Sequence, residues 1–167
     1  MKASESRASW LAALRIYLPF ILLANLFWEV LQLPLYTIWQ QGNAGEIAFA
    51  VLHCTGGDLL IALSALTLAL VLFGHPQWPQ QRFRSVAGCT VILGVAYTIF
   101  SEWLNINIRQ SWAYSEFMPV VPLFDVGLSP LLQWLFIPSI GLLLARRVAQ
   151  RSNSYGQLRS HRRPYAR

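Results

Sequence analysis

The sequence predicts an all-α membrane protein with four transmembrane helices, on the evidence of its composition and of its long apolar stretches. Hydrophobic residues make up 55% of the 167 residues and charged residues only 12%, about half the charged fraction of a typical soluble domain. The mean hydropathy is +0.43. This composition disfavours a water-soluble domain, and with only 10 glycines and 9 prolines it also excludes a disordered or collagen-like chain.

Four stretches have the roughly 20 predominantly apolar residues that a helix needs to cross the hydrocarbon core of a bilayer. They are residues 16–36, 47–73, 86–106 and 127–145. Residues 16–145 therefore form the expected transmembrane domain, with an N-terminal flank of residues 1–15 and a basic tail of residues 146–167. The first stretch is longer than the apolar core of a signal peptide and ends in Leu33-Pro34-Leu35-Tyr36, so we expect it to be retained as an anchor.

Lys and Arg are concentrated in alternate flanks of these stretches. They occur at both chain ends and in the middle connection, as Lys2, Arg7, Arg15, Arg82, Arg84, Arg146, Arg147, Arg151, Arg159, Arg162, Arg163 and Arg167. Residues 37–46 contain none, and the long loop of residues 107–126 contains only Arg109. Because positively charged flanks stay in the cytoplasm, both termini are expected to be cytoplasmic.

The net charge of +6 does not indicate a nucleic-acid partner, since seven of the thirteen basic residues lie in the tail of residues 146–167. A basic segment that directly follows an apolar one is typical of the anionic face of a membrane. The two cysteines, Cys54 and Cys89, fall at different depths of different helices, so we expect no disulfide between them.

Four ionisable residues lie inside the predicted helices: Glu29, His53, Asp58 and Glu102. A charge at the bilayer centre costs at least about 2.5–3.5 kcal/mol, so such residues indicate a functional site. All four are expected at the midplane or in the half of the membrane away from the termini. Glu29, His53 and Asp58 are the candidate catalytic residues, and Glu102 completes a candidate set of ligands for a metal that the sequence does not identify.

Other polar residues share a helix face with these four, because residues three and four apart are neighbours on a helix. The resulting stripes are Asn25, Glu29 and Gln32; Thr98, Glu102 and Asn105; and Ser129 with Gln133. If the stripes turn inward, the bundle contains a polar chamber open to the far side. In the competing interpretation, polar side chains only form hydrogen bonds that hold the helices together. It applies to Asn25, Gln32, Thr98, Ser129 and Gln133.

The loop of residues 107–126 is too apolar for an ordinary solvated loop. Trp112, Tyr114 and Phe124 are expected at the membrane interface or folded back over the bundle. We interpret the loop as a lid above the chamber, with an interfacial anchor as the alternative. The candidate ligand-binding residues are Asn25, Gln32, Glu102, Asn105, Arg109, Trp112, Tyr114 and Gln133.

Four motifs follow one another along the chain: Trp28-Glu29-x-x-Gln32-x-Pro34-Leu35-Tyr36, His53-Cys54-x-x-Gly57-Asp58, Trp112-x-Tyr114 with Met118-Pro119, and Gly127-Leu128-x-Pro130-x-x-Gln133. Together they resemble a family of small, uncharacterised bacterial inner-membrane proteins. The resemblance implies four transmembrane helices, a multi-pass inner-membrane location and a shared polar set including Glu29, His53, Asp58 and Gln133. A weaker similarity links Glu29-x-x-Gln32-x-Pro34 to the emopamil-binding, sterol-isomerase-like membrane fold, whose members bind amphipathic lipids in a helical chamber.

Three function classes stay open. In the first, the chamber binds or processes an amphipathic lipid or isoprenoid, with Asp58 and Glu29 as proton donor and acceptor and His53 tuning one of them. In the second, a non-enzymatic component or subunit binds protons or a divalent cation through the four ionisable residues. In the third, the helices pack on partner proteins or on a second copy. Membrane lipids are the expected partners, and the sequence names no cofactor.

Overall fold

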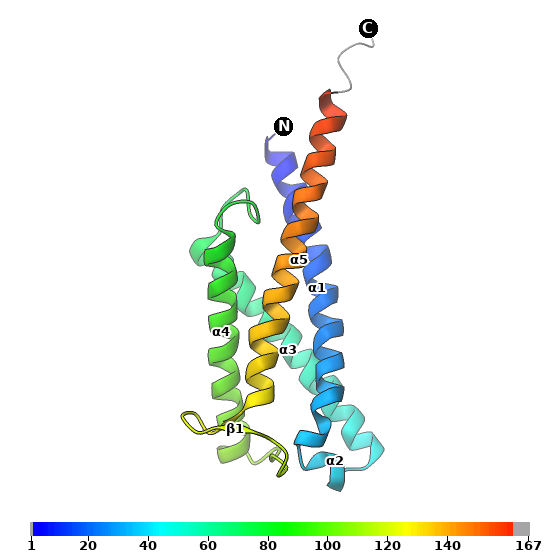
Figure 1. Ribbon diagram of the computed structural model, residues 1–167, viewed down its shortest axis with the longest axis vertical. Helices are drawn as coiled ribbons and strands as arrows, with labels where there is room; N and C mark the ends of the chain where they lie inside the picture. Colours follow the sequence, from blue (N-terminus) through cyan, green and yellow to red (C-terminus); the bar gives the residue numbers. More distant parts are fainter. Residues whose placement is uncertain (1, 162–167) are drawn as a thin grey trace.

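The computed structural model describes residues 2–161, with side chains for residues 9–151. Four long helices dominate it: α1 (Lys2–Gln32), α3 (Ala44–Phe73), α4 (Phe83–Trp103) and α5 (Leu128–His161) (Figure 1). The segments long and apolar enough to cross a membrane are Ser9–Leu35, Ala44–Phe73, Phe83–Ile108 and Leu128–Arg151. The predicted fold class, an all-α bundle of four candidate transmembrane helices, is confirmed.

The helices extend beyond the apolar stretches that identified them. Helix α1 begins at Lys2 and α5 continues to His161, so the flank and the start of the basic tail are helical. Hydropathy marks only the part of a helix that fits the hydrocarbon core, whereas backbone hydrogen bonds continue into water. Arg162, Arg163 and Arg167 lie outside the described residues.

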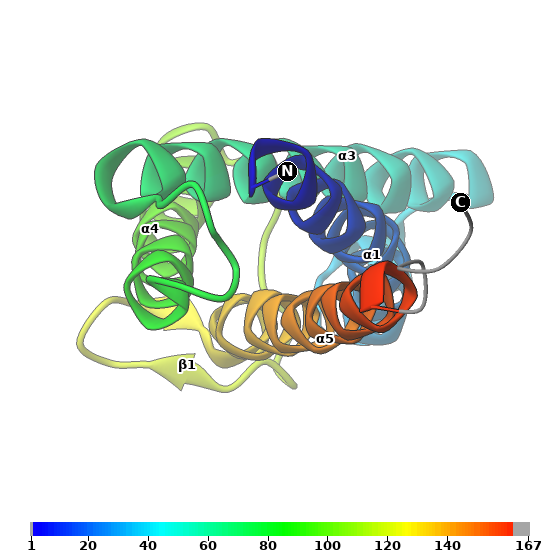
Figure 2. The ribbon, with the colours of Figure 1, turned by 90° about the horizontal axis from the view of Figure 1, so that it is seen from above.

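Each long helix packs on two neighbours, α1 on α5 and α3, and α4 on α3 and α5. Helix α3 is slanted, so that its C-terminal half lies beside α4 and its N-terminal half crosses behind α1 (Figures 1 and 2). Helix α1 begins and α5 ends at the same end of the bundle, which we call the terminal end; the opposite end is the far end.

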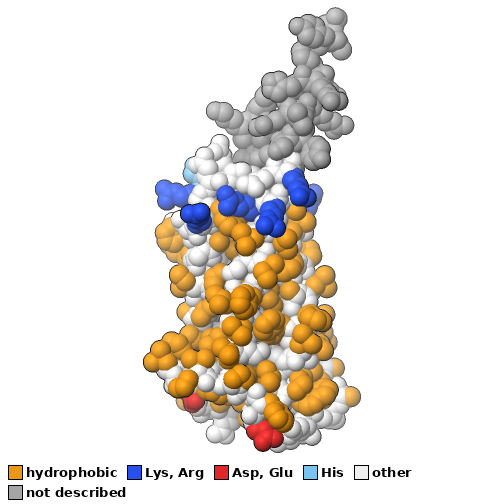
Figure 3. Space-filling model, viewed as in Figure 1, with side chains coloured by type: hydrophobic (Ala, Val, Ile, Leu, Met, Phe, Trp, Pro, Cys, Tyr) orange, Lys and Arg blue, Asp and Glu red, His pale blue; other side chains and the backbone are white. Residues whose placement is uncertain are grey.

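The apolar core lies in the half of the bundle next to the terminal end. Its largest members include Tyr17 and Ile21 from α1, Leu66 from α3, Trp78 from the α3–α4 connection, Val86 from α4 and Leu142 from α5. Arg side chains gather at this end, and acidic side chains are visible at the far end (Figure 3). The core holds the helices together at the terminal end and leaves the far half to polar side chains.

Short elements join the helices at the far end. The first connection contains η1 (Leu33–Leu35) and α2 (Ile38–Gln41), and α4 continues into a π-helical turn, η2 (Leu104–Ile108). The loop that follows forms a small antiparallel pair, β1 (Val120–Val121) with β2 (Val126–Gly127). The sequence interpretation contained no strands, because two-residue strands leave no detectable alternation.

The loop is fixed to the end of α1 by hydrogen bonds. The Thr37 amide donates to the Ala113 carbonyl at 3.0 Å, and the Ser115 amide donates to the Leu35 carbonyl at 2.9 Å. The Ser115 hydroxyl also donates to the Pro34 carbonyl at 2.9 Å. The loop therefore lies across the far end of the bundle instead of extending away from it.

Candidate functional site

The amide of Gln133 joins three helices in the far half of the bundle. Its Nε2 atom lies 2.9 Å from Asn25 Oδ1, 3.1 Å from Glu29 Oε1 and 2.9 Å from Asp58 Oδ2. Asn25 and Glu29 come from α1, Asp58 from α3 and Gln133 from α5. All four side chains are buried. Two carboxyl groups that are 29 positions apart in sequence thus share one donor; we call Glu29 and Asp58 the carboxyl pair.

Gln133 cannot satisfy all three acceptors at once, because a side-chain amide nitrogen carries only two hydrogens. The carboxyl groups of Glu29 and Asp58 also interact directly with each other. A proton held by the carboxyl pair supplies the missing donor. The geometry therefore favours a pair that carries one proton between two buried carboxyl groups, which is the arrangement that general acid–base chemistry uses.

A chain of hydrogen bonds extends from Glu29 toward the outside of α1. Gln32 Nε2 donates to Glu29 Oε1 at 2.8 Å, the Ser129 hydroxyl donates to Gln32 Oε1 at 2.8 Å, and Trp28 Nε1 donates to Ser129 Oγ at 3.1 Å. Every donor in this series of hydrogen bonds has an acceptor. Glu29 is therefore held by Gln32 on one side and by Gln133 on the other.

Glu102 on α4 forms a second, separate group with two tyrosines. The Tyr114 hydroxyl donates to Glu102 Oε2 at 2.6 Å, and the Tyr36 hydroxyl lies 3.4 Å from the same oxygen. The Tyr114 oxygen in turn accepts the Gly127 amide at 2.8 Å. The Glu102 group, which consists of these three side chains, ties α4 to both far-end connections.

Both tyrosines of the Glu102 group lie outside the membrane-spanning segments and stay protonated. Burial raises the pKa of Tyr36 well above its ordinary value, and the Glu102 carboxylate raises it further. The pKa of Tyr114 is raised by the same two causes in the same order. Each hydroxyl therefore remains a hydrogen-bond donor to Glu102 throughout the physiological pH range.

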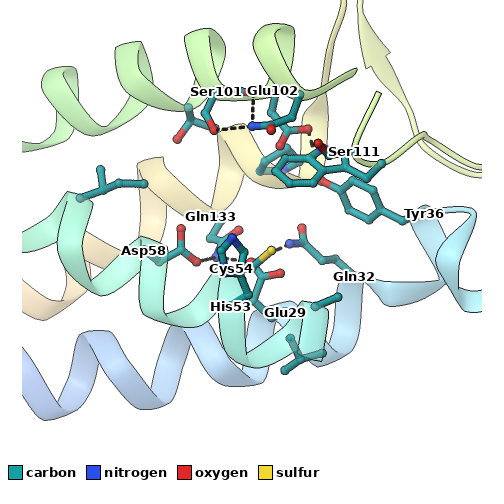
Figure 4. Close-up of a pocket in the computed structure, with 18 of the residues that line it drawn as sticks. Glu29, Gln32, Tyr36, His53, Cys54, Asp58, Ser101, Glu102, Ser111 and Gln133 are labelled. Atoms are coloured by element: carbon teal, nitrogen blue, oxygen red, sulfur yellow. Dashed lines mark hydrogen bonds between the residues drawn. The ribbon is translucent and has the colours of Figure 1, made fainter. Parts of the chain in front are cut away.

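A cavity of about 380 Å³ separates the carboxyl pair from the Glu102 group (Figure 4). All four long helices contribute to its wall, and the pair and Glu102 face it from opposite sides. The remaining polar lining consists of Gln32, Tyr36, His53, Cys54, Thr98, Ser101, Asn105, Arg109, Ser111, Trp112 and Gln133. This volume lies within the range of small-molecule sites.

The predicted site residues lie at three kinds of position: in the cavity wall, behind the wall, and at the rim. Glu29, Gln32, Asp58, Glu102, Asn105, Arg109, Trp112 and Gln133 line the cavity. Asn25 and Tyr114 are not part of its wall and instead hold Gln133 and Glu102 from behind. Glu102 meets two tyrosines, and among the described residues it forms no ion pair with Arg109, which is exposed at the rim.

His53 lines the rim of the cavity but is exposed, and its ring stacks on Phe49 with centroids 5.4 Å apart. Among the described residues it has no hydrogen bond to either member of the carboxyl pair. The carboxyl pair is held by Gln133, so the geometry gives His53 no contact through which to tune it.

Two polar side chains on the cavity wall use a hydrogen-bond donor within their own helix. Asn105 Nδ2 donates to the Ser101 carbonyl, four residues earlier, at 2.8 Å. The Thr98 hydroxyl likewise bonds to the Gly94 carbonyl, four residues earlier, at 3.0 Å. By contrast, Trp112 Nε1 is buried and has no acceptor among the described residues. The indole faces Glu102, but because this contact lacks hydrogen-bond geometry, Nε1 can donate instead to an oxygen inside the cavity.

The four candidate metal ligands do not come together. Among the described residues, no three His, Cys, Asp or Glu side chains are placed so that they could share a metal ion. Glu102 lies across the cavity from the carboxyl pair, and His53 is on the rim. The expected set of Glu29, His53, Asp58 and Glu102 thus fails as a ligand cluster because its members occupy three separate positions.

Sequence reasoning missed several lining residues. Cys54 and Gly57 precede Asp58 by four positions and one, and Ser101 precedes Asn105 by four, so helical spacing could have found Cys54 and Ser101. Trp134 and the Tyr36 hydroxyl carry no such signal, because an aromatic residue in a membrane helix or at its end is ordinarily interpreted as packing.

We expect Tyr114→Phe to loosen the loop without unfolding the bundle. The change removes a hydrogen bond to a charged group, which contributes about 1.5–3 kcal/mol, and leaves the Gly127 amide without its acceptor. Hydrogen exchange of the Gly127 amide should accelerate, while exchange in α1 and α5 stays slow. Tyr97→Phe is the control, since the Tyr97 hydroxyl has no hydrogen bond to the loop among the described residues; equal exchange in both variants would contradict the role of Tyr114.

No protein-family model, curated protein or solved structure matches this chain. The resemblance to bacterial inner-membrane proteins is thus not supported by a matching family. The functional argument rests on four candidate membrane-spanning helices and on the chemistry of the carboxyl pair, the Glu102 group and the cavity between them.

Proposed function

We propose that this protein binds the polar end of an amphipathic lipid or isoprenoid in its cavity, where the carboxyl pair exchanges a proton with the bound molecule. The observation that carries the proposal is the sharing of the single Gln133 amide by two buried carboxyl groups on the wall of a 380 Å³ cavity. A pair of carboxyl groups in unequal protonation states can act as acid and base in turn.

The free energies of burial and of hydrogen bonding favour this function over a purely structural role for the carboxyl pair. An ionised Asp or Arg at the centre of a membrane helix costs about 2.5–3.5 kcal/mol, whereas one polar hydrogen bond in a membrane bundle returns about 0.6 kcal/mol. Glu29 accepts two side-chain hydrogen bonds, and Asp58 accepts one from Gln133 and a further one from Trp134. These four bonds together return about 2.4 kcal/mol, which does not exceed the cost of burying the one ionised carboxyl group of the pair, so packing alone gives no reason for placing it there.

The cavity favours a hydroxyl group as the polar end of the ligand. Three carboxyl groups on the wall, Glu29, Asp58 and Glu102, accept hydrogen bonds and repel an anionic head such as a phosphate. Trp112 Nε1, on the same wall, is a donor that faces Glu102 and has no acceptor in hydrogen-bond geometry among the described residues. A hydroxyl donates to a carboxylate and accepts from the indole at the same time, so an amphipathic alcohol matches both features.

The orientation follows from the charges at the two ends. Apart from Arg109, the described Arg side chains gather at the terminal end, and by the positive-inside rule we expect that end in the cytoplasm. The cavity then lies in the outer half of a cytoplasmic membrane, within reach of lipids of that leaflet. Second copies of this chain and other membrane proteins are further candidate partners for its apolar sides.

Native mass spectrometry of the detergent-purified protein with added oleyl alcohol tests the proposal. The wild type is expected to carry one bound alcohol or a copurified lipid alcohol, and Asp58→Asn is expected to bind it ten- to a hundredfold less. This factor corresponds to the loss of one hydrogen bond to a charged group, about 1.5–3 kcal/mol. Glu116→Gln, at an exposed loop position, serves as the control for removal of a carboxylate.

The other outcomes are equally informative. Binding that is the same in Asp58→Asn as in the wild type would contradict a role for the carboxyl pair. If neither protein binds any amphiphile, the proposal is overturned and the pair becomes a proton-binding element of the second function class. Oleate added in place of oleyl alcohol should bind much more weakly, because its carboxylate would face the negative charge of the carboxyl pair and Glu102.

A further inference from the structure

The cavity has an opening on the side of the bundle between α3 and α4. Leu60 on α3 and Tyr97 on α4 both line the cavity, yet Leu60 is 66% exposed and Tyr97 is 49% exposed. A side chain that lines a cavity and is also largely exposed stands at its mouth. These two residues come from facing helices, so they mark the two sides of one opening.

This opening lies at the depth of the membrane and not at its surface. Leu60 is 13 residues from the last residue of α3 and 16 from the first, which is about 20 Å or more from either end of the helix. Tyr97 lies well inside the span Phe83–Ile108. A molecule that passes between Leu60 and Tyr97 therefore comes from the lipid and not from water.

The slant of α3 produces the opening. Its C-terminal half packs through Ala62, Leu66 and Ala69 in the core, whereas its N-terminal half diverges from α4 toward the far end (Figures 1 and 2). Gly57 on α3 lines the cavity. A side-chain carbon built on Gly57 would meet no atom within 4 Å, so the space in front of this glycine is open.

The loop after α4 covers part of the far end of the cavity, where the exposed Arg109 and Ser111 also line it and leave a polar edge open. The loop after α4 is fixed over the end of α1 by its backbone hydrogen bonds to Leu35 and Thr37. Trp112 from this loop forms part of the cavity wall. The wall between α3 and α4 has no comparable cross-connection in the cavity-lining residues that the structure describes.

We propose that the gap between α3 and α4, bounded by Gly57, Leu60 and Tyr97, is a lateral entrance through which an amphipathic alcohol enters from the bilayer, with its chain remaining in the gap. The inference rests on the proposed function and adds the route. The hydroxyl head reaches the carboxyl pair at the inner wall while Leu60 and Tyr97 contact the chain. A ligand held this way never leaves the hydrocarbon region.

Closing the gap with a chemical cross-link tests the route. We would place cysteines at both sides of the mouth, Leu60→Cys and Tyr97→Cys, in a background with Cys54→Ala and Cys89→Ala. A bismaleimide with a reducible disulfide in its linker then bridges the two helices. The protein is studied in phosphatidylcholine nanodiscs with oleyl alcohol as the probe, and bound alcohol is counted by native mass spectrometry.

Cross-linking before the alcohol is added should block uptake, and cross-linking after loading should trap the alcohol when the protein is moved to alcohol-free nanodiscs. Reduction of the linker leaves both half-linkers in place and should reverse both effects, so the reduced protein is the matched control for the attached groups themselves. Uptake and release at unchanged rates after cross-linking would overturn the lateral route. Absence of binding in the protein before cross-linking would instead count against the proposed function.

Two glycines supply an independent comparison on one helix. Gly57→Leu is expected to slow uptake of oleyl alcohol at least tenfold, because the new side chain occupies the mouth. Gly56 has the same open surroundings but does not line the cavity, so Gly56→Leu should leave uptake unchanged. Equal uptake by the two variants would overturn the assignment of the entrance to this face of α3.

Discussion

Replacement of Gln133 by leucine should destabilise the protein by about 3 kcal/mol or more and abolish its binding of an amphipathic alcohol. The amide is the donor that Asn25, Glu29 and Asp58 share, and each buried acceptor left without a donor costs about 1–3 kcal/mol. For a chain of this length, such a loss lowers Tm by on the order of 10 °C. Thermal unfolding in detergent, monitored by circular dichroism, measures the change.

Gln40→Leu is the matched control for this variant. Gln40 is exposed on α2 and its side chain makes no hydrogen bond with other described residues. The same chemical change there should leave Tm within a degree or two of the wild type, as surface substitutions usually do. If Gln133→Leu and Gln40→Leu unfold at the same temperature, Gln133 does not hold the three helices together.

Gly94→Val should destabilise the protein by a similar amount, because it adds atoms to a tightly packed contact instead of removing a hydrogen-bond donor. Helix α4 packs closely on α5 at this glycine, and a side-chain carbon built there would lie only 2.2 Å from Trp134 Cε3. Trp134 is 3% exposed and belongs to the apolar core, so it has little room to move. Overpacking of this kind costs about 1–3 kcal/mol or more. The expected result is a lower Tm together with a shifted fluorescence maximum as Trp134 is displaced.

A second glycine on α4 separates this clash from any general effect of valine. A side-chain carbon at Gly88 would meet nothing within 4 Å, so Gly88→Val should be tolerated. Because Trp134 also lines the cavity, Gly94→Val should weaken binding of oleyl alcohol while Gly88→Val leaves it intact. Two variants with the same stability would show that α4 and α5 can separate at Gly94 without cost.

The fold class could be predicted from the sequence because the bilayer imposes a requirement that is visible as a pattern along the chain. A helix that crosses it needs an uninterrupted apolar stretch, and the four such stretches are all helices in the structure. The exact ends of the helices could not be predicted, since hydropathy does not mark the polar turns by which α1 extends back to Lys2 and α5 forward to His161.

Spacing within one helix also located residues that share a face. Asn25, Glu29 and Gln32 all point inward from α1, and so do Thr98, Glu102 and Asn105 from α4. His53 was placed less well. It is five residues from Asp58, which corresponds to about 140° around the helix, so His53 lies exposed at the rim of the cavity while Asp58 is buried at its inner wall.

Contacts between helices could not be deduced from spacing. The meeting of Glu29, Asp58 and Gln133 depends on how each helix is rotated and on the slant of α3, which core packing at the terminal end determines. The same holds for the bridge between Tyr36 and Tyr114, which joins two connections far apart in the sequence. The separation of Glu102 from the carboxyl pair follows from these contacts, and with it the failure of the four-residue metal set.

The most direct test of the central claim is an experimental structure of the protein with a brominated long-chain alcohol bound. The bromine atoms identify the chain by their anomalous scattering, and the density of the head identifies the hydroxyl. We predict the hydroxyl in the cavity between the carboxyl pair and Trp112, with the bromines between Leu60 and Tyr97. Bromine signal only on the outer surface of the bundle, with an empty cavity, would contradict both the ligand and its route.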